Sequence, residues 1–369
     1  MKAEKNKLEI LLDEIKKLQP DVNGEIVGDY LIFRNEKFTG IDFSDMAVDL
    51  DHVCFYGCEF INGFSLNSIN SHCVEIEGCS ITELRIVNAL VLTMNVINTS
   101  ITNMYVYDSY LREMQLYNVN INGAVFSCLH EDSVVTMHAS DVDNATFCSI
   151  TECVQVLFEC VSISNSTFAN CKIGSKWSFD KCEITNSNFN NTELNDVNFT
   201  RCNLGDTQFD GRCKLTGVNM TDVSLMNSIV PDDSNRPMDV RYCTFTRCKF
   251  MKRNVYADMH KCVIDNCVCI ETDLRSCSIT LSNISGVTLY NANTSWTYIE
   301  MCSIKGCSFI NTRMVDVTIR NTDTDCNNSI ENVVSNVTYD KDDIDEENPQ
   351  DVVIPYATSL DVLIGDKEE

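Results

Sequence analysis

The chain has 369 residues, 44 % of them hydrophobic, and a net charge of −26. This is enough apolar material for a sizeable core. The negative charge disfavours direct binding to nucleic acid or anionic lipid and favours a basic protein partner or a protein that normally holds DNA. No apolar run approaches the ~20 residues that span a bilayer, and the charged start does not resemble a signal peptide. We therefore expect a cytoplasmic protein, located in a host cytoplasm or a virion if a phage encodes it.

Residues 1–20 are predicted to form an amphipathic helix. Its apolar residues recur at helical spacing, and a proline ends it: Leu8, Leu11, Leu12, Ile15, Leu18 and Pro20. Two roles fit this helix. It either caps the open end of the body that follows, whose exposed edge would invite aggregation, or it mediates oligomerisation.

A five-residue repeat dominates residues 21–335. The longest run places eleven aliphatic or aromatic residues in steps of five, from Ile76 to Phe126, and further runs begin at Phe158 and Phe245. A second series of smaller residues lies two positions before the first. Two inward residues separated by one outward residue fit a very short strand. Repeated strands and turns then form coils, which must stack on one another to bury a shared core.

Several stretches resemble the pentapeptide-repeat family, whose motif is a small residue, Asn or Asp, Leu or Phe, a polar residue and any residue. They include Ser187-Asn-Phe-Asn-Asn, Val197-Asn-Phe-Thr-Arg and Cys202-Asn-Leu-Gly-Asp, and the resemblance covers roughly residues 31 to 320. It implies an all-β fold, a right-handed parallel β-helix solenoid with four sides and four pentapeptides per coil. The N-terminal α-helix would then cap this solenoid.

The chain has 21 cysteines. Thirteen of them occupy the small-residue slot two positions before a central apolar residue, namely Cys58, Cys79, Cys171, Cys182, Cys202, Cys213, Cys243, Cys248, Cys262, Cys267, Cys277, Cys302 and Cys307. Because this slot suits a small apolar group, we interpret them as reduced core residues rather than disulfides. Neither the cysteines nor the histidines show metal-ligand spacing, so no metal and no cofactor is expected.

The repeat breaks near residues 129–141 and again near residues 231–240. Loops that leave a rigid scaffold often carry function, although both breaks also fit tolerated insertions. Residues 336–369 form an acidic tail. The composition at its start is typical of disorder, whereas the apolar residues at 352–354 and 362–364 favour partial folding back onto the body.

Two candidate partner-binding surfaces lie on the body. Four tyrosines beside inward residues are predicted to point outwards, either as one interface cluster or as a stack between coils: Tyr105, Tyr107, Tyr110 and Tyr117. The second surface joins the break near 231–240 to its basic flank and comprises Asp232, Asp233, Arg236, Arg241, Arg247, Lys249, Lys252 and Arg253. The segment 113–171 differs from this flank, since it has seven acidic residues and no lysine or arginine.

The sequence shows no motif for catalysis, neither a glycine-rich phosphate loop after a strand nor a nucleophile elbow. We therefore expect a non-enzymatic, protein-binding solenoid with no catalytic residues. Its resemblance to pentapeptide-repeat proteins of the quinolone-resistance type, which bind DNA gyrase, implies a DNA mimic that modulates a DNA-binding enzyme such as gyrase. The alternative is a structural or adaptor protein, such as a phage or virion component or an effector scaffold. A continuous acidic stripe would favour mimicry, and scattered acidic residues the adaptor.

Overall fold

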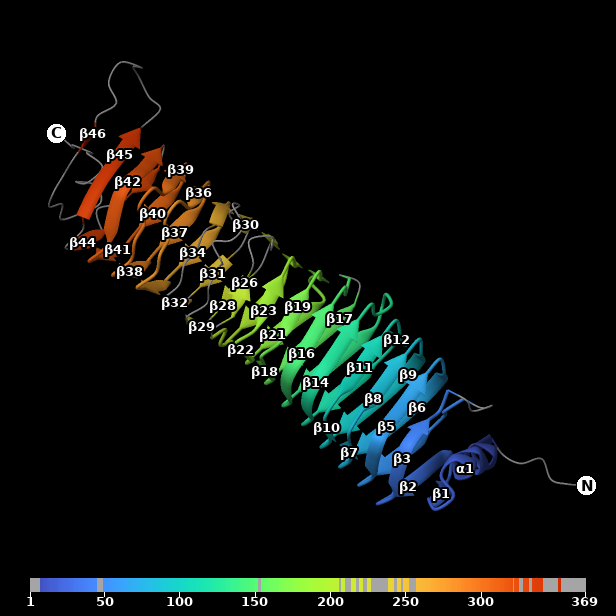
Figure 1. Cartoon of the computed structure of the whole chain (residues 1–369). Helices are drawn as coiled ribbons and strands as arrows, with labels where there is room; N and C mark the ends of the chain where they lie inside the picture. Colours follow the sequence, from blue (N-terminus) through green and yellow to red (C-terminus); the bar gives the residue numbers. More distant parts are fainter. Residues whose placement is uncertain are drawn as a thin grey trace, which may run out of the picture. The chain divides into compact units, whose positions relative to one another are not determined.

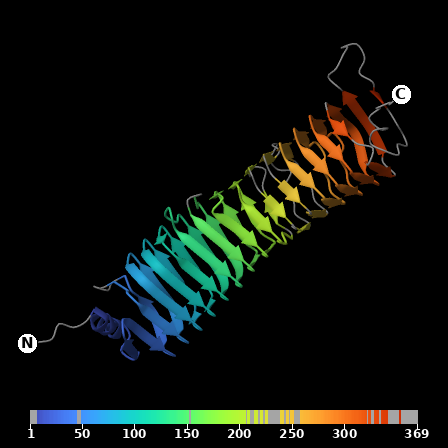
Figure 2. The same ribbon diagram turned by 180° about the vertical axis from the view of Figure 1, so that it is seen from behind.

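The computed structural model divides the chain into two compact units, Met1–Glu183 and Ile184–Glu369, which we call unit 1 and unit 2. It describes residues 7–44, 49–151, 154–205, 207–209, 214–216, 219–221, 224–226, 238–241, 244–246, 248–251, 257–320, 322–324, 328–331, 334–340 and 351–352. Apart from one N-terminal helix, the elements of both units are short β-strands that wind into stacked coils (Figures 1 and 2). Within the described residues, no helix has the length and apolar character needed to cross a membrane.

The helix α1 (Lys7–Leu18) confirms the predicted N-terminal helix. Its buried residues Leu8, Leu11 and Ile15 face the first strands of unit 1, β1 (Gly24–Val27) and β2 (Tyr30–Arg34). Just beyond the helix, the side chain of Gln19 both donates to the Thr39 carbonyl (2.9 Å) and accepts from the Thr39 N–H (3.1 Å). These two hydrogen bonds fasten the end of the helix to β3 (Lys37–Asp42), so that α1 covers the first coil of unit 1.

Parallel strands form two sheets in unit 1, apart from β1, which is antiparallel to β2. The first sheet contains β2, β4 (Val53–Tyr56), β6 (Asn70–Glu77), β9 (Leu90–Ile97), β12 (Tyr110–Leu111), β13 (Met114–Tyr117), β15 (Val134–His138), β17 (Gln155–Glu159) and β21 (Trp177–Asp180). The second contains β3, β5 (Glu59–Asn67), β7 (Ser80–Ile81), β8 (Leu84–Val87), β10 (Ser100–Ile101), β11 (Met104–Tyr107), β14 (Asn120–Ser127), β16 (Asp141–Cys148), β18 (Ser162–Ser164), β19 (Thr167–Ala169) and β22 (Glu183–Thr185). The short strand β20 (Lys172–Ile173) follows β19 in the chain.

Unit 2 repeats this architecture with shorter strands. One sheet contains β25 (Asn198–Thr200), β28 (Asn219–Thr221), β31 (Thr244–Thr246), β34 (Val263–Asp265), β37 (Asn283–Ser285), β40 (Ser303–Lys305) and β43 (Asp323–Thr324), and β23 (Asn188–Asn190) pairs separately with β26 (Gln208–Phe209). A further sheet contains β24 (Glu193–Asn195), β27 (Lys214–Thr216), β30 (Met238–Arg241), β33 (Ala257–His260), β36 (Ser278–Thr280), β39 (Tyr298–Glu300), β42 (Arg313–Arg320), β45 (Val334–Asp340) and β46 (Asp351–Val352), the last strand being antiparallel. The remaining sheet contains β29 (Ser224–Met226), β32 (Lys249–Met251), β35 (Val268–Ile270), β38 (Thr288–Tyr290), β41 (Ser308–Ile310) and β44 (Ser329–Glu331). The predicted right-handed parallel β-helix is thus confirmed.

Coils of unequal length stack in register in unit 1. Residues that pair directly in neighbouring coils are 22, 20 and 21 positions apart in Leu31–Val53, Met104–Ala124 and Met114–Val135. Between strands the backbone turns through the left-handed conformation, for example at Asn88 (φ 51°) and Asp108 (φ 48°). Asparagine and aspartate tolerate this conformation better than most residues do, which explains their frequency at these corners.

The predicted inward series fills the interior of the coils. Phenylalanine rings stack from coil to coil, with ring centroids 5.2 Å apart for Phe126 and Phe147 and 4.8 Å apart for Phe147 and Phe168. Ile101, inside the longest run of the repeat, is 1 % exposed. The five-residue spacing therefore identified the core of unit 1 correctly, whereas in unit 2 Ile264, Leu274, Ile279, Ile284 and Ile299 of the same series are only half-buried.

The small-residue slot turns out to be a hydrogen-bonding position. Cys79 accepts from the Cys58 N–H (3.2 Å), and its thiol donates to the Phe55 carbonyl of the preceding coil (3.4 Å). Ser109 and Thr312 occupy the same slot and donate to the carbonyls of their preceding coils in the same way. The predicted slot cysteines that the structure describes are all buried, and none of them forms a disulfide: Cys58, Cys79, Cys171, Cys182, Cys202, Cys248, Cys262, Cys267, Cys277, Cys302 and Cys307. Cys213 and Cys243 lie outside the described residues.

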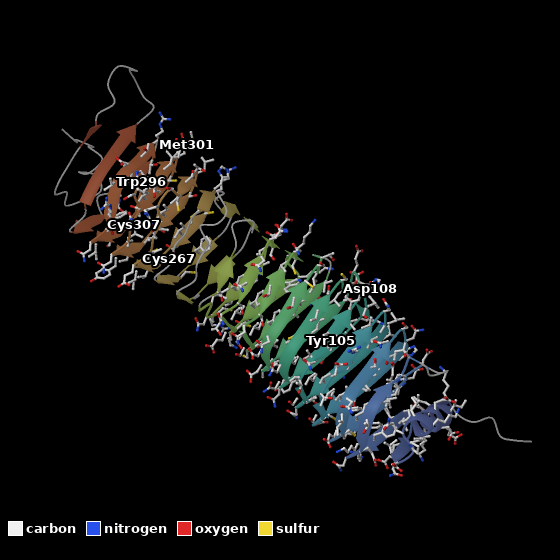
Figure 3. The ribbon with its side chains drawn as sticks, in the orientation of Figure 1. Tyr105, Asp108, Cys267, Trp296, Met301 and Cys307 are labelled. Carbon is white, nitrogen blue, oxygen red and sulfur yellow. The ribbon has the colours of Figure 1, made fainter. Side chains whose placement is uncertain are left out.

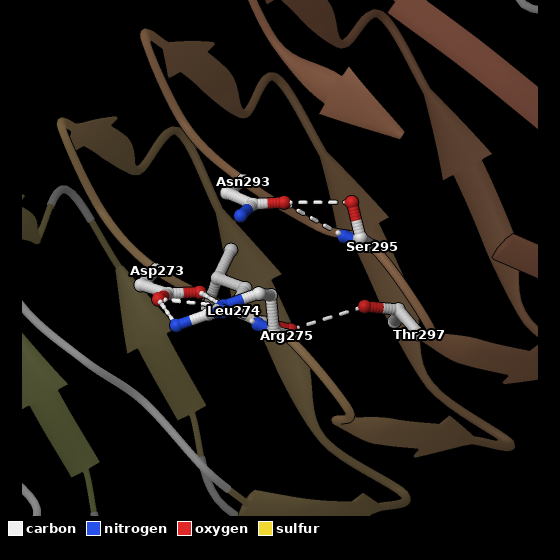
Figure 4. A network of polar contacts seen from close by, with 6 residues as sticks. All are labelled: Asp273, Leu274, Arg275, Asn293, Ser295 and Thr297. Carbon is white, nitrogen blue, oxygen red and sulfur yellow. Dashed lines mark hydrogen bonds and ion pairs between the residues drawn. The ribbon is translucent and has the colours of Figure 1, made fainter. Parts of the chain in front are cut away.

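Side-chain turns complete one side of the coils in unit 2. The residues of this network are Asp273, Leu274, Arg275, Asn293, Ser295 and Thr297 (Figure 4). The Asp273 carboxylate accepts from the backbone N–H of Arg275 (3.2 Å) and pairs with its guanidinium, while the Asn293 Oδ1 accepts from the backbone N–H of Ser295 (3.1 Å). Thr297 links neighbouring coils by donating to the Leu274 carbonyl (3.0 Å). Asp and Asn hold these turns because their side chains bond the backbone two residues further on.

Much of the first predicted break, residues 129–141, is regular structure. Its residues 134–138 form β15, which pairs with β13 and β17 in the first sheet. The irregularity is confined to a tight turn in which the Ser133 N–H donates to the His130 carbonyl (3.3 Å) and Asp132 has φ 62°. Of the second predicted break, residues 238–240 belong to β30 and residues 231–237 lie outside the described residues, as do residues 341–350 and 353–369 of the tail.

Candidate functional site

Tyr105 and Tyr107 point outwards from β11 in the second sheet. Their side chains are 38 % and 48 % exposed, whereas Met104 and Val106, which alternate with them, are buried. This alternation is what a short strand with one face in the core requires. Figure 3 labels Tyr105 on this strand.

Neighbouring strands extend the apolar character of this face. Tyr107 lies in register with Val87 of β8, and Tyr105 lies in register with Arg85 of β8 and Val125 of β14. The Arg85 guanidinium lies over the Tyr105 ring, 5.6 Å from its centroid, and pairs with Glu83 at 2.5 Å. The tyrosine ring is thus held by a cation–π contact on a rigid strand.

Tyr110 lies on the other side of the corner that follows Tyr107. It begins β12 in the first sheet, where it pairs with Leu90, an exposed residue of the preceding coil. The corner between the two tyrosines is Asp108, which Figure 3 also labels. We define the tyrosine surface as the outward side chains around this corner, Val87, Leu90, Tyr105, Tyr107 and Tyr110.

Tyr117 does not belong to the tyrosine surface. It lies on β13 of the first sheet, half a coil beyond Tyr107, and its ring stacks on His138 with centroids 4.9 Å apart and an interplanar angle of 6°. The structure therefore brings three of the four predicted tyrosines together around one corner. For Tyr117 it shows the alternative arrangement, stacking between adjacent coils.

A depression of about 620 Å³ adjoins the tyrosine surface. Its lining residues are Asp108, Tyr110, Cys128, Leu129, His130, Glu131, Ser149 and Thr151. Three of them are left-handed corners of successive coils, Asp108, Cys128 and Ser149, with φ angles of 48°, 52° and 54°. The turn of the first predicted break supplies His130. Its backbone N–H donates to the Ser109 carbonyl (3.1 Å), and its ring Nε2 lies 3.4 Å from the Asp108 carboxylate.

Most of the second predicted surface lies outside the described residues, namely Asp232, Asp233, Arg236, Arg247, Lys252 and Arg253. The other two residues belong to different sheets of unit 2. Arg241 ends β30, and Lys249 begins β32. The structure thus leaves this surface as a prediction.

Sequence reasoning missed an exposed apolar group in unit 2. Leu281, Trp296 and Met301 are 43 %, 54 % and 51 % exposed, and Figure 3 labels the last two. All three are corners with φ angles of 51°, 58° and 51°, where Asn, Asp and Gly are the usual residues. The Trp296 Nε1 donates to the Asp316 carboxylate at 3.2 Å. The signal in the sequence was a large apolar residue at the turn position of the repeat.

The described residues offer little reactive chemistry. Within them, no three His, Cys, Asp or Glu side chains converge as a metal site. Burial raises the pKa of Cys54 to about 12, and the neighbouring Glu75 carboxylate adds to this effect, so that the thiol stays protonated and unreactive at neutral pH.

The acidic residues of the segment 113–171 are spread over different sheets. Asp141 and Asp143 lie on β16 of the second sheet, whereas Glu159 ends β17 of the first. The residues that pair in successive coils through Asp141 are Ser100, Asn120, Asp141 and Ser162, so the charge does not recur. Hydrogen bonds from Asn165 and Ser164 lower the pKa of Asp143, whose carboxylate is already engaged within the molecule. The column of paired residues through Asp141 therefore forms no continuous acidic stripe.

Comparison with known proteins identifies the repeat. Residues 178–211 match the family model for pentapeptide repeats, with eight copies. This part of the chain therefore carries pentapeptide repeats. No curated protein matches its sequence.

Three solved structures are similar to this chain at low identity. HetL, a pentapeptide-repeat protein involved in heterocyst differentiation regulation from the cyanobacterium Nostoc sp. strain PCC 7120, is 11 % identical, with 59 % of this chain and 91 % of that chain covered and a TM-score of 0.35. QnrB1, a plasmid-mediated fluoroquinolone resistance protein, is 18 % identical, with 52 % and 94 % covered and a TM-score of 0.27. The periplasmic alginate epimerase AlgG is 8 % identical, with 90 % and 82 % covered and a TM-score of 0.26.

Proposed function

We propose that this repeat protein is a non-enzymatic docking solenoid that binds a partner protein through the tyrosine surface. The observation that carries the proposal is the group of aromatic and aliphatic side chains around the Asp108 corner, of which Leu90, Tyr105 and Tyr107 are exposed and Val87 and Tyr110 half-buried. Exposed apolar groups of this kind mark interaction sites, and tyrosine is enriched among the residues that dominate binding energy. Because hydrogen-bonded strands fix the side-chain directions before binding, little conformational entropy is lost when a partner docks.

The adaptor hypothesis is better supported than DNA mimicry. A mimic needs carboxylates that recur along the coils, and the pairing through Asp141 places serine and asparagine above and below it. Tyrosine, valine and leucine side chains resemble a protein interface more closely than they resemble a phosphate backbone. We therefore propose a structural or adaptor role, with modulation of gyrase as the competing function.

The test of docking is a matched pair of variants. Tyr105→Ala/Tyr107→Ala removes the centre of the tyrosine surface, and Tyr117→Ala removes a tyrosine of similar exposure from the first sheet. Partners captured from a lysate of the producing cells by the parent protein would be purified, and their affinities measured by calorimetry. The double variant should bind about 30-fold more weakly, the equivalent of about 2 kcal/mol, while Tyr117→Ala should bind like the parent.

A DNA-supercoiling assay with purified gyrase separates the two functions. The docking proposal predicts no change in supercoiling at micromolar protein. Inhibition or protection of gyrase that survives Tyr105→Ala/Tyr107→Ala would favour mimicry. Equal affinity of all three proteins for every purified partner would place the interface elsewhere.

A further inference from the structure

The depression beside the tyrosine surface indicates the chemistry of the partner, an inference that rests on the proposed function. Two of its lining residues are carboxylates, Asp108 and Glu131, and neither lysine nor arginine lines it. Among the lining residues only His130 can become positively charged, and its Nε2 lies 3.4 Å from the Asp108 carboxylate. An occupant that supplies its own positive charge would therefore complement the depression.

The surroundings preserve this negative character. The segment 113–171, which supplies most of the lining, has no lysine or arginine, and the arginine nearest before it in the chain, Arg112, is not a lining residue. Lys176 comes from a later coil and pairs with Asp132 at 3.5 Å, so its charge is already engaged. A concave site with one sign of charge raises the local concentration of ligands with the opposite charge.

The same unit shows how its tyrosines accept a guanidinium group. Arg85 lies over the ring of Tyr105, and Arg34 lies over the ring of Tyr56 at 4.8 Å from its centroid. Each of these arginines also pairs with a glutamate, Arg85 with Glu83 and Arg34 with Glu25. Ring and carboxylate thus act together on one guanidinium. The depression offers the same two groups in Tyr110 and its neighbouring carboxylates, with no arginine of this chain among its lining residues.

We propose that the depression receives an arginine side chain from an extended partner segment whose apolar residues rest on the tyrosine surface. Arginine fits better than lysine because its planar group stacks on an aromatic ring and bonds a carboxylate with two N–H groups at once. Tyr110 belongs to both the surface and the depression, so one segment can reach both. The carboxylates are exposed, and the contact is therefore salt-sensitive.

The probe is a random 12-residue peptide library displayed on phage and selected on the full chain. Enriched peptides would be synthesised, and their affinities measured by fluorescence anisotropy at two salt concentrations. Asp108→Asn/Glu131→Gln removes the two charges; asparagine is a suitable replacement because it also tolerates the left-handed corner, as Asn88 does one coil earlier. Glu77→Gln/Glu183→Gln removes two exposed charges elsewhere in unit 1 and is the matched control.

The expected result is enrichment of arginine next to apolar residues, with affinity at least 10-fold weaker for Asp108→Asn/Glu131→Gln and unchanged for the control. Peptides that lose affinity on Tyr105→Ala/Tyr107→Ala but not on removal of the two charges would overturn the arginine inference and leave the docking proposal standing. Equal enrichment of lysine, or equal losses in the two charge variants, would show attraction by net charge alone and would overturn it too. If every variant bound the peptides with the affinity of the parent, or if no peptide were enriched, both proposals would be contradicted.

Discussion

At the scale of single residues, the corners of the coils set the main conformational constraint. Every coil must turn its backbone through the left-handed region, which is costly for residues with a bulky side chain. Asn88, Asn98 and Asn118 are typical solutions, while Leu281, Trp296 and Met301 keep large apolar side chains exposed in the same conformation. At these three corners the left-handed conformation costs conformational free energy, and the side chains expose apolar area.

Replacing Leu281 with asparagine should stabilise the fold. Asparagine tolerates the left-handed conformation better than leucine does. Because the leucine side chain is 43 % exposed, its removal costs little packing energy, and we expect the free energy of unfolding to rise by about 1 kcal/mol. Urea denaturation measures the change. The matched control is the reverse exchange at a corner of the same geometry, Asn88→Leu, which should destabilise by a similar amount. A loss of stability in Leu281→Asn would show that this leucine contributes packing energy in place.

The burial of the slot cysteines was predictable from the sequence, whereas their hydrogen bonds were not. The spacing predicted that Cys302 and its equivalents are buried and form no disulfide, and this holds for those that the structure describes. It attributed them to apolar filling, whereas the Cys302 thiol donates to the Ile279 carbonyl (3.3 Å) and its N–H donates to Thr322 (3.4 Å). Cysteine, serine and threonine share a slot because each can bond the neighbouring coil. The partner groups belong to another coil, about 20 residues away, and a five-residue pattern does not reveal them.

At the scale of elements, a charged cluster joins the N-terminal helix to the coils. Asp51 precedes β4, and its carboxylate bonds both Lys7 of α1, at 3.4 Å, and the Nδ1 of His72 on β6. Burial acts to raise the pKa of Asp51, but the hydrogen bonds from His72 and Lys7 outweigh it and hold that pKa below its usual value of 3.8. The cluster therefore links three elements through one ionised carboxylate.

The contribution of Asp51 should disappear in acid. Since its pKa is lower in the folded than in the unfolded chain, its ionised form stabilises the fold above about pH 4. This stabilisation is lost as the pH falls through the lowered value. Asp51→Asn should therefore be less stable than the parent by about 1 kcal/mol at pH 7 and nearly equal to it near pH 2. Chemical denaturation across this range measures both proteins. A difference that persists at low pH would assign the effect to geometry rather than charge.

The grouping of outward residues was predictable only in part. The repeat correctly placed Tyr105, Tyr107 and Tyr117 outside the core. Proximity in the sequence was misleading for Tyr117, because ten residues correspond to half a coil and carry it to another sheet. The predicted break at 129–141 is a tight turn followed by β15, which fits the tolerated insertion that the sequence also allowed. One extra residue disturbs the sequence pattern, yet the corner absorbs it and β15 stays in register.

At the scale of the whole molecule, both units are built on the same principle. Each buries its core between stacked coils, and each ends a sheet with an antiparallel strand, β1 in unit 1 and β46 in unit 2. The antiparallel strand covers a sheet edge that would otherwise pair with another chain. The described slot cysteines lie inside this core in both units, and their thiols are protected as long as the coils remain stacked.

Thiol labelling should therefore follow the fold. Cys160 is exposed at a left-handed corner, whereas Cys171 is buried and the pKa of its thiol is raised to about 11 by burial. Brief treatment with iodoacetamide at pH 8 should modify Cys160 well before the slot cysteines, as read by mass spectrometry of peptides. Urea should remove the difference. Modification of Cys171 as fast as Cys160 in the native protein would show that the coils open readily.

The unequal coils have a consequence for how such a chain evolves. In an ordinary sheet, inserting one residue in a strand exchanges its inner and outer faces, so most such insertions are lethal to the fold. Here coils of 20, 21 and 22 residues keep the same inward residues above one another, because the added residue remains at a corner. Single codons can therefore be gained or lost at corners without a compensating change in the core. The surface can thus change at a corner while the core stays in register, as at the turn of His130, which lines the depression.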